Sequence, residues 1–197
     1  MRTNAIFSQH QFVYRLALAS DANGQPPPTE VIEEFFELGN ITEIKRLFTA
    51  ACGAALSEQY NWNSGSPGNL LYIYERIETL IEACFILYTE KRKRKNLSRR
   101  LRRSTAPEFA NDILLPSSLT AEEIKNPVLV IQSFFKVGTL KEWKLALYAW
   151  LEAGLSEYDV LQNVEITSIL PYHVHLQRLL DACWYINRAI KNNSSKR

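Results

Sequence analysis

The chain has 197 residues, a formal net charge of +2, 46% hydrophobic residues and 22% charged residues. This composition excludes a disordered chain, because disordered sequences lack the apolar residues that build a core. No segment approaches the roughly 18 uninterrupted apolar residues of a membrane-spanning helix, so we expect no membrane partner.

The N-terminal segment is predicted to form one helix over residues 9–19, followed by a linker. Ser8 and Gln11 have the spacing of a capping box, in which two side chains bond the first amides of a helix. Polar residues such as His10 and Arg15 interrupt the apolar run that a secretory signal would need. We therefore expect an ordinary amphipathic helix here.

The rest of the chain contains an internal duplication. Residues 28–87 match residues 127–186 at a constant offset of 99, with 17 identities in 60 positions. Chance would give about four identities at one offset. The matched register continues through the loops, which favours a true duplication over two unrelated amphipathic helices. The identical residues of the first copy are Pro28, Val31, Ile32, Phe35, Phe36, Gly39, Glu43, Lys45, Ala50, Ala54, Leu56, Ser57, Glu58, Leu71, Leu80, Ala83 and Cys84.

Each copy is predicted to begin with a short helix, a sharp corner and a second helix. Gly39 and its equivalent Gly138 are expected to end the first helix, Gly39 in the left-handed conformation that glycine adopts easily. Asn40 and Thr139 then begin the second helix, each with a glutamate three residues later, as in a capping box. The corner is therefore encoded twice.

The second and third helices of each copy follow the i, i+3, i+7 spacing of an amphipathic helix. Units of about 60 residues are marginal alone, so we expect the copies to pack together about a pseudo-twofold axis. The predicted fold is all-α: two pseudo-symmetric three-helix repeats plus an N-terminal helix, packed into one compact helical body. The predicted parts are an N-terminal helix and linker (1–27), repeat 1 (28–90), a basic connection (91–126), repeat 2 (127–191) and a C-terminal tail (192–197).

The strongest functional signal is a basic segment between the copies. Residues 91–103 carry nine positive charges and no negative charge, so the remainder of the chain has a net charge of −7 (+2 − 9). Such a local concentration of cations is typical of binding to a polyanion, with salt-dependent release of counterions. Few aromatic residues lie among them, which favours contact with phosphates over base stacking. The candidate nucleic-acid-binding residues are Lys91, Arg92, Lys93, Arg94, Lys95, Arg99, Arg100, Arg102 and Arg103.

The basic segment is expected to be helical, and two roles other than nucleic-acid binding remain open for it. Leu97 and Leu101 are four residues apart, so the third helix of the first copy is expected to extend into the segment. A docking strip for an acidic protein surface and an inert solvated linker are the alternative roles. A sequence-specific reading of bases is not predicted.

Other chemistry finds no support in the sequence, and we expect no cofactor and no metal. His173 and His175 are two residues apart on a predicted helix, so their side chains diverge by about 200° and cannot chelate one metal together. Cys84 and Cys183 occupy equivalent positions in two apolar stripes, which indicates packing. Three cysteines without a CxxC pair favour a reducing compartment, the cytoplasm.

These observations predict a non-enzymatic helical binding protein. The basic segment is expected to contact nucleic-acid phosphates, and the helical body is expected to contact a protein partner or a second copy of the chain. One alternative is a protein–protein adaptor or oligomeric scaffold that binds no nucleic acid. A second alternative is an enzyme whose site residues are dispersed in the sequence, since motif searches do not find such sites.

Overall fold

The computed structural model describes residues 26–37, 39–56, 62, 65–104, 118–155 and 166–194. Within these ranges, the side chains at positions 100, 102–104, 166–170, 193 and 194 are not described. The helix predicted over residues 9–19 and most of the linker after it lie outside the described residues. Every regular element in the described part is an α-helix, as the sequence predicts.

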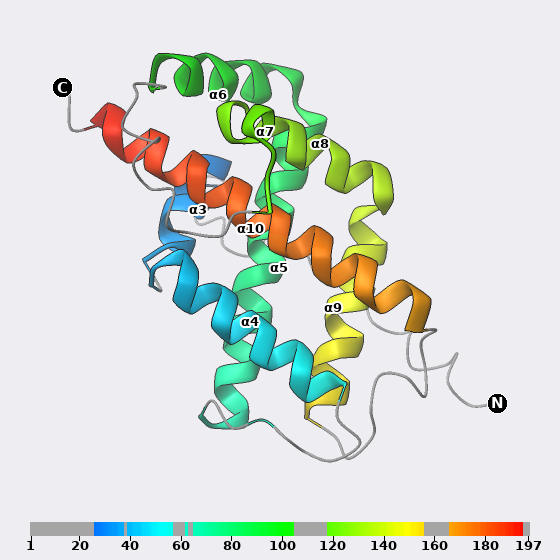
Figure 1. The fold of residues 1–197 in the computed structure, drawn as a ribbon. Helices are drawn as coiled ribbons and strands as arrows, with labels where there is room; N and C mark the ends of the chain where they lie inside the picture. Colours follow the sequence, from blue (N-terminus) through cyan, green and yellow to red (C-terminus); the bar gives the residue numbers. More distant parts are fainter. Residues whose placement is uncertain are drawn as a thin grey trace.

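Eight described helices pack into one compact body (Figure 1). Figure 1 shows α10 running diagonally across α5, with α6 and α7 at one end of the body and the start of α5 at the other. None of the described helices is long and apolar enough to cross a membrane. The bounds are α3 (Pro28–Phe35), α4 (Ile41–Ala55), α5 (Pro67–Thr89), α6 (Lys91–Ser104), α7 (Ala121–Lys125), α8 (Val128–Val137), α9 (Leu140–Gly154) and α10 (Ile166–Ser194).

The corner before α9 has the predicted capping box, and the corner before α4 has half of it. Thr139 accepts from the backbone N–H of Glu142, whose carboxylate accepts from the Thr139 backbone. Asn40 likewise accepts from the backbone N–H of Glu43 at 2.9 Å. The Glu43 carboxylate, however, accepts two hydrogen bonds from Arg46. An exposed arginine one turn away thus takes the acceptor that would have completed the box.

The two glycines of the corners differ in conformation. The prediction that Gly39 ends the first helix is wrong, because α3 ends at Phe35 and Phe36 is its C-cap. Gly39 follows three residues later with φ +155°, directly before the Asn40 N-cap. Gly138 does end α8, but its backbone is extended, with φ −155°. A side chain at Gly138 would meet the indole of Trp143, whose N–H donates to the Gly138 carbonyl.

The core is built mainly by the apolar stripes that the sequence pattern predicts. Helix α3 packs on α5, α8 packs on α10, and α4 packs on α9. In the same body, α10 contacts α3 and α4, while α5 contacts α8 and α9. Trp62 is buried in a small cluster with Leu70 and Leu151.

Two ion pairs cross this core. Lys45 of α4 donates to both carboxylate oxygens of Asp181 in α10, at 2.9 and 3.1 Å. Lys144 of α9 pairs with Glu82 of α5 and lies 3.2 Å from Glu78 on the same helix. In both pairs the lysine and the carboxylate come from opposite halves of the chain. The offset of 99 residues relates one pair to the other.

The two helices that carry these carboxylates meet at a pair of cysteines. The Sγ atoms of Cys84 in α5 and Cys183 in α10 are 3.4 Å apart, and both residues are fully buried. Burial and the contact with Cys84 raise the pKa of the Cys183 thiol, with the hydrogen bond to Cys84 as the largest cause. The burial of both residues agrees with the packing that their places in the apolar stripes indicate.

The ion pair of Lys144 generates a stability prediction. Lys144→Met is expected to lower the free energy of unfolding by about 3–5 kcal/mol, because it removes the cation between two buried carboxylates. Lys45→Met is the matched control, with an expected loss of about 1–3 kcal/mol. The loss is smaller because Lys45 is 21% exposed and Asp181 keeps two hydrogen bonds from Ser118. Urea unfolding measures both variants, and a smaller loss for Lys144→Met than for Lys45→Met would contradict the prediction.

Candidate nucleic-acid interface

The basic segment folds as a helix of its own. The sequence predicted that the third helix of the first copy would continue into this segment. That prediction is wrong, because a single residue, Glu90, separates the two helices. Helix α5 ends at Thr89, and Glu90 has an extended backbone with φ −88° and ψ 93°. Helix α6 then begins at Lys91, in a new direction at the end of the body (Figure 1). The break at Glu90 lets the basic residues lie across the end of the body.

One face of α6 is fixed to the core. Leu97 and Leu101 are 2% and 4% exposed and belong to the main hydrophobic cluster, and α6 packs on α10 and α5. Arg94 lies one turn before Leu97, is half-buried and donates a hydrogen bond to the Tyr88 carbonyl. The spacing 94, 97, 101 is that of one helix face, and this face of α6 lies against the body.

The opposite face of α6 carries exposed cations. Lys91, Arg92, Lys93, Lys95 and Arg99 are exposed. Lys93 pairs with Glu90 at 2.8 Å, a surface pair of small energetic value. Among the described residues, no carboxylate pairs with the other four cations. The backbone of Arg100, Arg102 and Arg103 belongs to α6, but their side chains lie outside the description.

A groove lies between α6 and the start of α8. Its volume is about 290 Å³, and none of the described residues that line it is a carboxylate. Arg94, Lys95 and Arg99 line it from α6. Two amide side chains line it from the other side, Asn126 before α8 and Gln132 within α8. Sequence reasoning missed both amides, because neither belongs to the basic segment or to a motif. Only the packing of α8 beside α6 brings them there.

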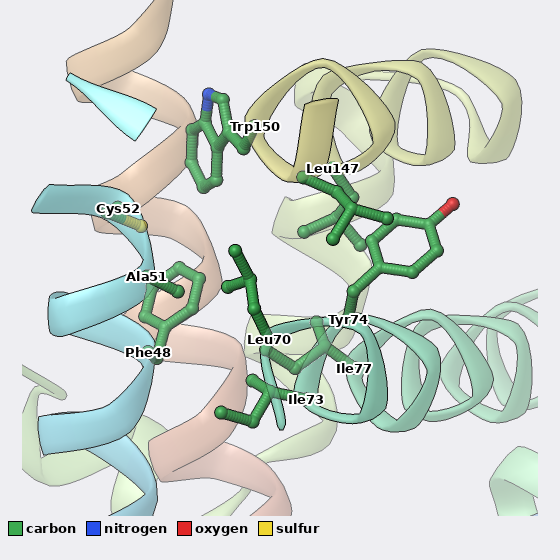
Figure 2. A pocket seen from close by; sticks show the side chains of 10 residues that line it. Phe48, Ala51, Cys52, Leu70, Ile73, Tyr74, Ile77, Leu147 and Trp150 are labelled. Carbon is green, nitrogen blue, oxygen red and sulfur yellow. The ribbon is translucent and has the colours of Figure 1, made fainter. Parts of the chain in front are cut away.

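A second hollow lies at the far end of the body, between α4, α5 and α9. Figure 2 shows Phe48, Cys52, Leu70 and Trp150 around it, with the Tyr74 hydroxyl pointing away. Its volume is about 30 Å³, roughly the space of one water molecule. Such a small apolar hollow has neither the room nor the polar groups that hold a substrate.

The histidines and cysteines of the described residues lie in packing environments. His173 stacks on Phe48 with ring centroids 5.2 Å apart, and Gln177 lies 3.0 Å from its Nε2. His175 lies against the Trp143 ring instead. Burial raises the pKa of the Cys52 thiol. The described residues contain no group of three or more His, Cys, Asp or Glu side chains that could hold a metal ion.

The packing of His173 makes stability depend on pH. Burial lowers the pKa of His173 below its usual 6.5, so the unfolded chain takes up the proton first as the pH falls. The neutral His173 ring contributes fully to the free energy of unfolding above about pH 6.5. This contribution declines as the pH falls toward the lowered pKa of the folded state.

His173→Gln is therefore expected to flatten the decrease in unfolding free energy between about pH 7.5 and pH 5, because glutamine does not titrate. Urea unfolding at several pH values measures this decrease. His175→Gln is measured for comparison. Burial and Arg178 also lower the pKa of His175, so this ring can add to the same decrease in unfolding free energy. Glu142 titrates below the window, because a hydrogen bond from Thr139 lowers its pKa. A slope unchanged by both substitutions would contradict this origin of the pH dependence.

The chain was compared with protein-family models, with curated proteins and with solved structures. None of the three comparisons gives a significant match.

Proposed function

We propose that the protein is a non-enzymatic binding protein that contacts nucleic-acid phosphates through α6. The observation that carries this proposal is that exposed cations on that helix have no described carboxylate partner. Lys91, Arg92, Lys95 and Arg99 have no ion pair with a described carboxylate, while Leu97 and Leu101 fix the helix to the core. Cations without a described carboxylate partner attract phosphates, and the docked helix holds their backbone in place before binding.

The spacing of these cations supports a polyanion as the ligand. From Lys91 to Arg99 the helix rises by about 12 Å. Duplex DNA places a phosphate of each strand every 3.4 Å along its axis, so about three or four phosphates fit this length. The net charge of −7 outside the segment confines the attraction to this end of the body.

We also propose that the chain arose by duplication of one three-helix unit, with α3, α4 and α5 equivalent to α8, α9 and α10. The crossed ion pairs Lys45–Asp181 and Lys144–Glu82 support this equivalence, as does the contact of Cys84 with Cys183. At the offset of 99, Lys45 corresponds to Lys144 and Glu82 corresponds to Asp181, so one ion pair is equivalent to the other. Cys84 corresponds to Cys183, its own contact partner. The buried thiols also support a reducing compartment, and we propose the cytoplasm.

The alternative function is a protein adaptor or an oligomeric scaffold. Several large apolar side chains are exposed on the body, including Leu71 and Tyr72 on α5 and Leu56 and Leu155 after α4 and α9. Leu71 and Tyr72 are neighbours in the sequence, and exposed apolar residues that lie together are typical of protein interfaces. In this alternative, the cations of α6 contact an acidic protein surface. Capture of the same protein partners before and after nuclease treatment favours the adaptor.

The test of the proposed function removes two exposed cations from α6. Arg92→Gln with Arg99→Gln is expected to weaken binding to DNA and RNA duplexes of mixed sequence. The slope of log affinity against log salt should become shallower by about 0.9 per lost phosphate contact. Fluorescence anisotropy at several salt concentrations measures both quantities, and circular dichroism checks the fold.

The matched control removes the same charge elsewhere. Lys136 and Lys141 are exposed on α8 and α9, away from α6, so Lys136→Gln with Lys141→Gln should bind nearly as the parent does. A wider variant replaces Arg99, Arg100, Arg102 and Arg103 by Gln. If that variant is folded and binds both duplexes with parental affinity and salt slope, the proposed function is wrong.

A further inference from the structure

We infer that the groove between α6 and α8 is a seat for one backbone phosphate of a nucleic acid. This inference rests on the proposed function and assigns part of the binding to residues outside the basic segment. Gln132 and Asn126 are the residues in question, and they act together with Lys95 and Arg99 across the groove.

The groove has the donors that a phosphate requires. Lys95 and Arg99 supply positive charge and N–H groups from one wall. Gln132 and Asn126 supply amide N–H groups from the other wall, and both side chains are half-buried rather than freely exposed. Helix α8 begins at Val128, which also lines the groove, so the positive end of its dipole adds to the same field.

No acidic residue stands among the groove-lining residues in the described part of the chain, and this distinguishes the groove from an ordinary surface ion-pair network. The exposed cations of a folded protein commonly lie beside acidic side chains, as Lys93 of α6 lies beside Glu90, the residue before that helix. The groove instead collects cations and neutral amides. Amide side chains do not neutralise cations, so the positive potential stays available to an anion.

A nucleic-acid phosphate fits the groove better than a lipid headgroup does. A basic amphipathic helix binds a membrane by inserting its apolar face between lipids. In α6 that face is already occupied, because Leu97 and Leu101 are buried in the core. The exposed cations also continue along α6 beyond the groove, which matches a repeating chain of phosphates.

The test adds one negative charge to the wall of the groove that lies outside the basic segment. Gln132→Glu is expected to weaken binding to a DNA or RNA duplex of about 20 base pairs roughly tenfold. The salt slope should become shallower by about 0.9, the value of one phosphate contact. Lys136→Gln changes the net charge equally, one turn further along α8, and should leave both quantities near the parental values.

A second variant guards against an effect on folding. Gln132→Met keeps the length of the side chain and removes its amide, and it should weaken binding by a smaller factor with an unchanged melting temperature. Equal weakening by Gln132→Glu and Lys136→Gln would overturn the inference, because it would show an effect of net charge alone.

Two further outcomes separate the inference from the proposed function. If Gln132→Glu binds as the parent does while Arg92→Gln with Arg99→Gln binds weakly, the groove is not the seat and the proposed function stands. If none of these variants weakens binding, both are wrong. Vesicles containing phosphatidylserine form a separate arm. Binding to them that depends on Gln132, without binding to either duplex, would overturn the choice of nucleic acid.

Discussion

The crossed ion pairs are the constraint on which the body of this protein depends. A lysine on α9 reaches carboxylates on α5, and a lysine on α4 reaches a carboxylate on α10. Lys144 and its two carboxylates are buried, as is Asp181, whereas Lys45 is partly exposed. A buried charge without its partner is costly. The two halves of the chain are thereby held in one relative position, which hydrophobic contact alone specifies less strictly. The ends of α5 and α10, and with them the place of α6, follow from that position.

The basic helix depends on this arrangement through two leucines. A helix with nine cations is destabilised in isolation, because like charges at i and i+4 repel each other. Docking of Leu97 and Leu101 against the core outweighs the repulsion and leaves Lys91, Arg92, Lys93, Lys95 and Arg99 exposed. The same docking brings α6 beside α8, which creates the groove with its two amides. The candidate site is thus a product of tertiary packing as much as of sequence.

Sequence patterns predicted the helices well and the site only in part. Apolar spacing and capping residues located α3, α4, α5, α8, α9 and α10, because these signals are local. The break at Glu90 was not predicted, since no proline or glycine marks it. Asn126 and Gln132 were missed because their role depends on a neighbouring helix. The ion pairs, in contrast, had a signal: Lys45 and Lys144 interrupt apolar stripes at equivalent positions, opposite the matched acids Glu82 and Asp181.

The contact between Cys84 and Cys183 has a practical consequence. Both thiols lie at the middle of the body with no exposed surface, where α5 meets α10. A thiol-labelling reagent reaches them only when these two helices separate, so the labelling rate measures how often the centre of the molecule opens. Cys52, at 7% exposure beside the small hollow of Figure 2, reports on local opening of α4 instead. Labelling of the native cysteines therefore measures both local opening of α4 and separation of the central helices.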